Sequence, residues 1–195
     1  MNLFYKLLTR QFYLFFLFAC LLGSIPSRAQ LPPKLWDRTL GGNGNDGLQQ
    51  VWETADGGYI VSGTSYSGFS GDKTRTRDGL WILKLDASGT KQWDQAYGAG
   101  IVNSGASVQQ TADGGYVLAG TVWAGITGDK TEPSRGSYDY WILRLDANGA
   151  KLWDRTYGGD DYDLLKSIRQ LPDGGYLVGG YSYSGQTGDK SQPLR

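Results

Sequence analysis

The chain has 195 residues, and its 19 Lys and Arg balance 19 Asp and Glu. It has no His and one Cys, which excludes histidine-based metal sites and acid/base catalysis, zinc sites built from several thiolates, and disulfides within the chain. Its neutral charge argues against a broad nucleic-acid-binding surface. Its 30 Gly, 13 Tyr and 7 Trp favour short strands joined by turns.

Residues 1–29 are predicted to be a secretory signal peptide. Basic residues precede the apolar run Phe12–Leu22, which is shorter than the roughly 20 residues of a membrane span. Ser27-Arg28-Ala29 then predicts cleavage after Ala29, so the mature chain would begin at Gln30 without a transmembrane span. Two alternatives are a buried N-terminal helix and lipoprotein processing at Cys20. The expected location is secreted or at the cell surface.

Residues 30–195 form a repeat region. Three short motifs each occur three times, displaced by 57 and then by 60 residues. The motifs begin at Lys34, Lys91 and Lys151 (Lys-x-Trp-Asp), at Asp56, Asp113 and Asp173 (Asp-Gly-Gly-Tyr), and at Gly71, Gly128 and Gly188 (Gly-Asp-Lys). The predicted repeats span about 34–90, 91–150 and 151–195, and the last one is incomplete.

One period contains four predicted strands, at Leu48–Thr54, Tyr59–Thr64, Leu80–Asp86 and Lys91–Tyr97. Asp56-Gly57 predicts a type I′ hairpin, which needs a positive φ at both turn residues. A long polar loop joins the second strand to the third. No stretch keeps a 3.6-residue apolar period, so no substantial helix is expected after the signal peptide.

Four short antiparallel strands in about 60 residues are typical of one β-propeller blade. The predicted fold is therefore all-β: a partial β-propeller of four-stranded antiparallel blades, with about 2.5 repeats in an open arc. Stacked blades bury each other's apolar faces. Trp36, Trp93 and Trp153 are expected to pack between neighbouring sheets.

Several of these motifs carry a family resemblance. The runs Gly41–Asp46, Asp56–Thr64 and Leu83–Gly89 resemble bacterial extracellular β-propeller repeats of the SBBP type. The resemblance covers nearly all of residues 34–190. It implies a large secreted or surface-attached protein and says little about function. Leu85–Trp93 is also similar, more distantly, to the tryptophan-docking motif of quinoprotein-like propellers, which is structural and implies no quinone.

The predicted strands do not complete a ring. A further strand at Lys34–Leu40 brings the expected total to eleven, and the third repeat stops after its second strand. This pattern indicates a piece of a longer product, and the alternative is a small protein that oligomerises into a ring. The second strand of the third repeat, Tyr176–Tyr181, should expose one edge, so the expected partners include further repeats of a longer chain or other copies of this one.

The longer loops form the expected ligand face, since function concentrates on loops held by a rigid scaffold. Tyr66, Trp123 and Tyr183 occupy equivalent positions on these loops and are candidates for stacking on the sugar rings of a polysaccharide. The alternative, which the large area of aromatic side chains favours, is that they pack underneath the loops.

Asp72, Asp129 and Asp189 recur within Gly-Asp-Lys. Each is expected to cap turn amides, with the adjacent Lys as charge partner; calcium binding is the alternative. Asp160–Asp163 has a more calcium-like composition, but the second repeat has Ile101–Ser104 there, so no repeat-wide calcium site is expected. Neither a metal nor a cofactor is predicted.

The expected function is that of a non-enzymatic extracellular scaffold, adhesion or carbohydrate-binding module. Its partner would be a polysaccharide or a cell-surface protein, and not a nucleic acid. The alternative is the N-terminal fragment of a propeller enzyme, quinoprotein-like or acting on polysaccharide, with its catalytic residues outside this chain. No catalytic residue is assigned, because a carboxylate that recurs in every repeat is more simply structural than catalytic.

Overall fold

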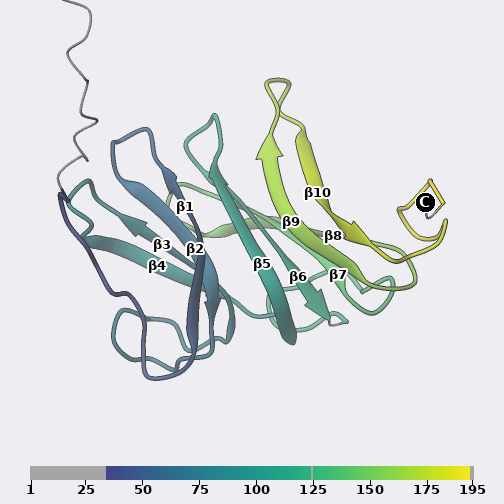
Figure 1. Cartoon of the computed structure of the whole chain (residues 1–195), viewed down its shortest axis with the longest axis horizontal. Coiled ribbons are helices and arrows are strands. Elements are labelled where there is room, and N and C mark those ends of the chain that lie inside the picture. Colours follow the sequence, from purple (N-terminus) through teal and green to yellow (C-terminus); the bar gives the residue numbers. More distant parts are fainter. Residues whose placement is uncertain (1–33, 124, 194–195) are drawn as a thin grey trace, which may run out of the picture. The chain divides into compact units, whose positions relative to one another are not determined.

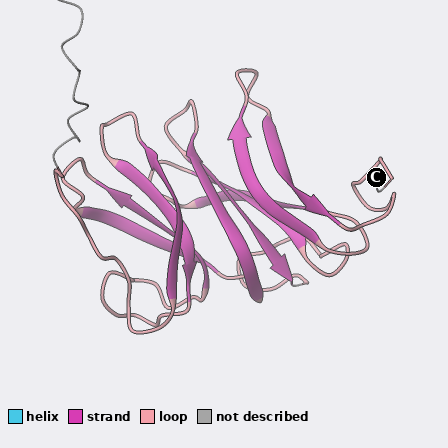
Figure 2. Cartoon of the chain, in the orientation of Figure 1, coloured by secondary structure: helices cyan, strands magenta, loops and turns pink. Residues whose placement is uncertain are grey.

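The computed structural model describes residues 34–123 and 125–193 (Figure 1). The predicted signal peptide, Cys20 and the cleavage site before Gln30 lie outside the described residues. The strands belong to one compact unit, Trp36–Arg195. The described residues form ten strands and no helix (Figure 2). They accordingly contain no helix with the length and apolar character of a membrane span.

The strands are arranged in three antiparallel sheets, each in sequence order. The first sheet contains β1 (Asp46–Glu53), β2 (Tyr59–Ser65), β3 (Gly79–Leu85) and β4 (Lys91–Tyr97). The second contains β5 (Ile101–Gln110), β6 (Tyr116–Trp123), β7 (Asp139–Leu145) and β8 (Lys151–Tyr157). The third contains β9 (Asp163–Gln170) and β10 (Tyr176–Ser182). This open arc is the predicted partial propeller, and the four strands of each complete period are confirmed.

The predicted strand at Lys34–Leu40 is wrong, because this segment forms no strand. In the other two repeats, the corresponding strands β4 and β8 are hydrogen-bonded to the preceding β3 and β7. Among the described residues no strand precedes Lys34 to supply such a ladder. The side chain of Trp36 nevertheless packs against the first sheet, with its ring 5.5 Å from that of Tyr59 in an edge-to-face arrangement. The described residues place no second sheet on its other side, so the predicted packing of Trp36 between two sheets is not confirmed.

The turns between β1 and β2 and their equivalents have positive φ only at glycine. Gly57, Gly114 and Gly174 have φ values of 76°, 85° and 86°, as the Asp-Gly motif predicts. The predicted type I′ geometry is wrong, because no described residue other than glycine has a positive φ. Gly57 N donates to Thr54 O, and Thr54 N donates to Gly58 O. These bonds describe a three-residue loop in which a type I turn precedes a left-handed glycine.

The largest buried cluster of the described residues lies between the first and second sheets. Ile60, Leu80 and Ile82 of the first sheet form one fully buried cluster with side chains of the second, including Trp141 and Leu143. Burial of such side chains stabilises the fold by about 1.5–3 kcal/mol each. The cluster explains why strands of this composition occur in series, because each sheet covers the apolar face of the next.

The predicted packing of Trp93 and Trp153 between sheets is confirmed. The Trp93 ring, on β4, meets Tyr116 of β6 at 5.7 Å, and Trp153, on β8, meets Tyr176 of β10 at 6.1 Å. Both pairs are edge-to-face, which is a favoured geometry for aromatic rings. Each indole therefore joins the last strand of one sheet to the second strand of the next.

Candidate functional site

The two kinds of connection lie at opposite ends of the sheets. The short turns that precede β2, β6 and β10 lie along the upper side of Figure 1, and the longer connections that follow β2 and β6 lie below. The short ends are closed by three-residue turns, and the long loops carry the recurrent aromatic and acidic residues singled out from the sequence. The long-loop face is therefore the candidate functional site.

The predicted aromatic residues Tyr66, Trp123 and Tyr183, here called the aromatic row, lie where β2, β6 and β10 end. Their exposed fractions are 47%, 51% and 59%. The sequence favoured packing of these side chains underneath the loops. The structure does not show such packing, because about half of the surface of each side chain is accessible. The Tyr66 hydroxyl also donates a 2.8 Å hydrogen bond to the Val102 carbonyl of the next repeat, which holds this ring in place.

Two further apolar residues on this face were missed by sequence reasoning. Phe69 and Ile126 follow the aromatic row by three residues and are 72% and 68% exposed. The signal was present, because the two positions are displaced by the same 57 residues as the other motifs. The third repeat has the polar Gln186 at this position. The apolar surface is consequently larger in the first two repeats.

The predicted acidic residues Asp72, Asp129 and Asp189 each form a reciprocal pair of hydrogen bonds with a glycine 31 residues earlier. Asp129 Oδ2 accepts from Gly98 N at 2.9 Å, and Asp129 N donates to Gly98 O at 2.7 Å. Asp72 pairs with Gly41 and Asp189 with Gly158 in the same way. We call this arrangement the loop clamp. The carboxylates do cap backbone amides, but these amides belong to the segment that precedes the first strand of each sheet and not to the turn of the carboxylate itself.

The charge partner of the clamp is not the adjacent lysine. Arg135 of the second repeat reaches Asp189 of the third at 2.5 Å, and Arg77 of the first repeat reaches Asp129 of the second at 3.5 Å. The lysine next to Asp129, Lys130, instead points inward and is fully buried. The arginine positions were not predicted, since the contact joins residues of different repeats.

These contacts do not form a cation site. The described residues contain no group of three or more His, Cys, Asp or Glu side chains arranged to hold a metal ion. In the more calcium-like segment, Asp160 accepts from the Thr187 hydroxyl and Asp163 accepts from the Ser184 hydroxyl and from Gly159 N. The acidic residues of the long-loop face are therefore engaged in holding the loops.

A second acidic position, which sequence reasoning did not single out, lies inside each complete sheet. Trp81 and Trp141 are fully buried, and their indoles donate to Asp94 and Asp154 at 3.1 and 2.9 Å. Burial acts to raise the pKa of Asp154, but hydrogen bonds from Lys151, Thr131 and Trp141 lower it to about 2. The tryptophan and the aspartate of each pair both recur from one repeat to the next, and this recurrence could have identified them in the sequence.

Asp139 is an exception to the symmetry of the repeats. It occupies the position of Gly79 in the first repeat and is fully buried. Its Oδ2 accepts from Arg135 N at 2.9 Å, whereas Oδ1 has no hydrogen-bond partner. Burial raises the pKa of this carboxyl group. Because the carboxyl group is fully buried, it has no access to a substrate and is not assigned to the candidate site.

Neither the models of known protein families nor the sequences of curated proteins significantly match this chain.

Proposed function

We propose that this protein is a non-enzymatic extracellular binding scaffold whose aromatic row contacts an extended polysaccharide. The observation that carries the proposal is the accessibility of Tyr66, Trp123 and Tyr183 at equivalent positions of successive repeats. Flat aromatic surfaces present a large apolar contact area, and a regular spacing suits a polymer made of repeated sugar units.

The contacts around the row support this assignment. Tyr66 is fixed by its hydrogen bond to the next repeat, so little rotational freedom is lost on binding. Phe69 and Ile126 extend the exposed apolar surface beside two of the three rings. Exposed apolar groups gathered on one loop face are a recognised feature of binding surfaces.

The alternative, a fragment of a propeller enzyme, is less well supported. The recurrent carboxylates of the long-loop face are used by the loop clamp, and Asp94 and Asp154 are buried and bound by Trp, Thr and Lys side chains. Glycoside hydrolysis requires two accessible carboxylates that face the same space. The carboxylates named above do not provide such a pair. Catalysis would therefore need residues other than these.

Binding can be tested by depletion of the purified chain from solution with insoluble cellulose, chitin and β-1,3-glucan. One of these polymers should retain the chain, and Trp123→Ala should weaken retention about three- to tenfold. The matched control is Tyr181→Ala, because Tyr181 is 59% exposed but lies on β10 outside the aromatic row. Retention by no polymer, or equal losses in both variants, would refute the proposal.

Export is a separate part of the proposal and is supported by the residue pattern of 1–29. Expression with a native secretion system should yield extracellular protein that begins at Gln30, as read by mass spectrometry of its N-terminal peptide. A lipid-modified Cys20 at the N-terminus, or retention of an uncleaved chain inside the cell, would contradict it.

A further inference from the structure

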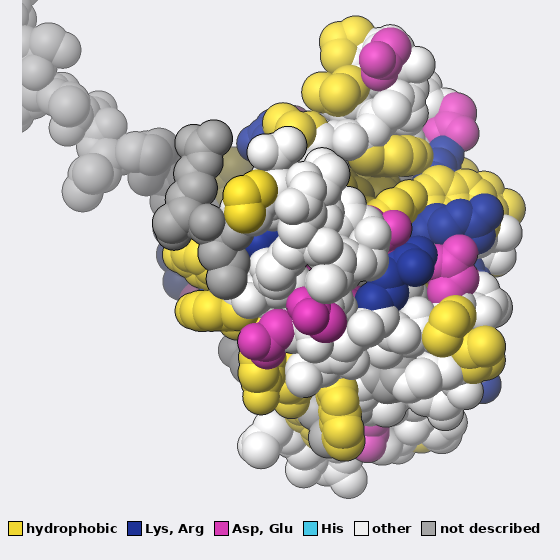
Figure 3. Space-filling model, turned by 90° about the vertical axis from the view of Figure 1, so that its right-hand side faces the viewer, with side chains coloured by type: hydrophobic (Ala, Val, Ile, Leu, Met, Phe, Trp, Pro, Cys, Tyr) yellow, Lys and Arg dark blue, Asp and Glu magenta, His cyan; other side chains and the backbone are white. Residues whose placement is uncertain are grey.

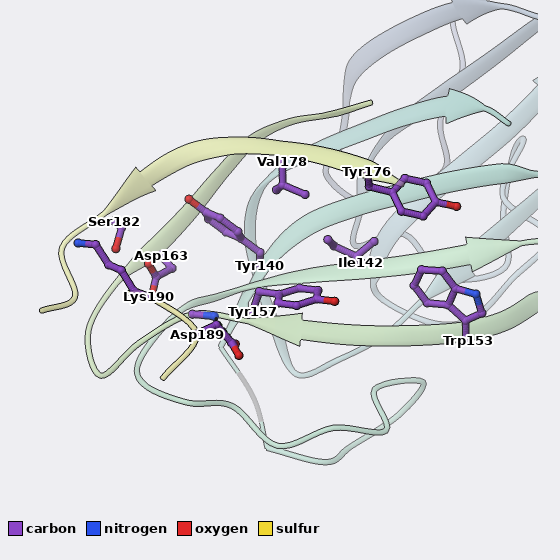
Figure 4. A pocket seen from close by; sticks show the side chains of 11 residues that line it. Tyr140, Ile142, Trp153, Tyr157, Asp163, Tyr176, Val178, Ser182, Asp189 and Lys190 are labelled. Carbon is purple, nitrogen blue, oxygen red and sulfur yellow. Dashed lines mark hydrogen bonds between the residues drawn. The ribbon is translucent and has the colours of Figure 1, made fainter. Parts of the chain in front are cut away.

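A cavity of about 550 Å³ lies between the second and third sheets. Its floor is formed by Tyr140 and Ile142 of β7 with Trp153 of β8, and its opposite wall by Tyr176 and Val178 of β10 (Figure 4). We call this cavity the β10 groove. Figure 3, which looks from the side of the third sheet, shows hydrophobic side chains gathered on this face.

The wall of the groove is also an open sheet edge. β10 pairs with β9 and, among the described residues, with no other strand. The corresponding strands β2 and β6 each pair with a strand on both sides. An edge of this kind presents unpaired backbone groups to an added strand. The groove therefore combines an apolar floor with a row of available hydrogen-bonding groups.

The first and second sheets show what occupies the same space one repeat earlier. The groove residues correspond to members of one buried cluster: Leu80, Ile82, Trp93, Tyr97, Tyr116, Leu118 and Val122. The other members of that cluster include Trp141, Leu143 and Leu145, which lie on one face of β7 and are all fully buried. The equivalent of the groove is thus filled by a strand with the pattern Trp-x-Leu-x-Leu.

The charged side chains at the two ends of the groove are complementary to the charges of a strand with the pattern Trp-x-Leu-x-Leu. Lys190 lies at one end, and its equivalent Lys73 is 3.8 Å from the carboxylate of Asp78, just before β3. Lys130, the equivalent in the second repeat, interacts electrostatically with Asp139 at the start of β7. The filled sites therefore place an acid near this lysine.

The opposite end has the reverse charge. Asp173, in the turn before β10, is exposed, and its Oδ1 accepts from Gly175 N at 2.9 Å. Its equivalents in the first two repeats, Asp56 and Asp113, form ion pairs with Lys84 of β3 and Arg144 of β7. Among the described residues no cation takes this place beside Asp173 in the third sheet.

We propose that the β10 groove binds an extended peptide strand of a partner polypeptide, added antiparallel to β10. The partner strand carries an acidic residue, Trp, Leu, a basic residue and Leu in the order acidic-x-Trp-x-Leu-basic-Leu. Strand addition supplies backbone hydrogen bonds, and the apolar and charged positions supply specificity. A second copy of this chain is a poor donor, because its strands of this pattern, β3 and β7, are paired on both edges.

The probe is a fluorescein-labelled peptide with the sequence of residues 137–146, which contains β7. Anisotropy should show saturable binding with one peptide per chain, and amide hydrogen exchange in β10 should slow on binding. The same peptide with Trp141→Ala should bind at least about tenfold more weakly, because the largest buried side chain is lost. This change leaves the protein unaltered, so misfolding cannot explain it.

Two variants of the protein locate the binding site. Val178→Asp places a charge on the groove wall and should weaken binding at least about tenfold, whereas Leu177→Asp, on the 62% exposed neighbour, should not. Asp173→Lys should weaken binding about threefold, and a peptide carrying Arg144→Glu should restore it. If Asp173 had only a structural role, the Arg144→Glu peptide would not restore binding to the Asp173→Lys variant.

Three outcomes would overturn the proposal. The first is no binding of the peptide at any soluble concentration. The second is a scrambled peptide that binds as tightly as the 137–146 peptide, or a Val178→Asp variant that binds the 137–146 peptide as tightly as the unaltered protein does. The third is a dimer of the chain in sedimentation velocity that Val178→Asp dissociates and Leu177→Asp does not, since a second copy would then occupy the groove.

Discussion

The indole of Trp141 donates its Nε1 hydrogen to Asp154 Oδ2 at 2.9 Å, and both groups are buried within the second sheet. The same carboxylate accepts from Thr131 N and from Thr131 Oγ1, so the loop before β7 is attached to β8 through one side chain. Lys151 Nζ lies 2.7 Å from Asp154 Oδ1 and supplies the compensating charge. Trp81 and Asp94 repeat the relationship in the first sheet.

This network predicts a pH dependence of stability. The pKa of Asp154 is about 2 in the folded chain against an ordinary value of 3.8. Its ionised form therefore contributes about 2 kcal/mol of stability above pH 4, which is lost as the pH falls from about 4 to about 2. Urea unfolding of the chain and of Asp154→Asn should differ most at pH 7 and least at pH 2. A constant difference across this range would contradict the prediction.

Asp139 is expected to show the opposite dependence. Burial raises the pKa of its carboxyl group, so the protonated form is favoured in the folded state. Its favourable contribution is complete below the ordinary pKa of about 4 and is lost as the pH rises through the raised value. Asp139→Asn should therefore increase the urea midpoint at pH 7 and not at pH 3. A lower midpoint at pH 7 would show that the contacts of the ionised group with Arg135 N and Lys130 outweigh the cost of its burial.

Truncation of an indole between sheets should destabilise the whole unit. Trp93→Ala removes the contact with Tyr116 and leaves a space beside the core, and the expected loss in unfolding free energy is about 2 kcal/mol. The matched control is Leu152→Ala, on a side chain that is 59% exposed, with an expected change within about 0.5 kcal/mol. Equal effects in chemical denaturation would argue against docking of the indole.

The turn before β6 separates a backbone effect from a packing effect. Gly114 has φ of 85°, and a Cβ atom there would meet no atom within 4 Å. Gly114→Val should still cost about 1 kcal/mol or more, because a β-branched residue strongly disfavours this conformation. Gly114→Asn should cost less, since Asn accepts the left-handed region more readily. An unchanged denaturation midpoint for the Val variant would contradict the assigned turn.

Local patterns were sufficient to predict the strands of the two complete periods and the sites of the turns. The strand-forming residues of Tyr59–Thr64 and the glycine at position 57 act over a few residues, so they can be read without knowledge of the fold. The turn type was misjudged because Asp-Gly is compatible with both a two-residue and a three-residue loop. Counting the residues between Thr54 and Gly58 as the loop would have indicated the longer form.

Contacts between distant residues were beyond the reach of these patterns. Lys34–Leu40 has a strand-like sequence, but a strand also requires a neighbour with which to pair. The positions of Tyr66 and Asp129 were evident from the repeat, whereas the accessibility of the first and the glycine partner of the second depend on how the loops fold. Periodicity thus located the candidate site without specifying what each residue does there.

The loop clamp has a consequence for how the protein unfolds. Asp129 and Gly98 hold the connection between the first and second sheets, and Trp93 crosses the same boundary to Tyr116. Both contacts must be lost when the two sheets separate, and neither is retained by a sheet on its own. The cooperative unit therefore includes the boundary between sheets, so the first and second sheets should melt in a single transition despite their separate hydrogen-bond ladders.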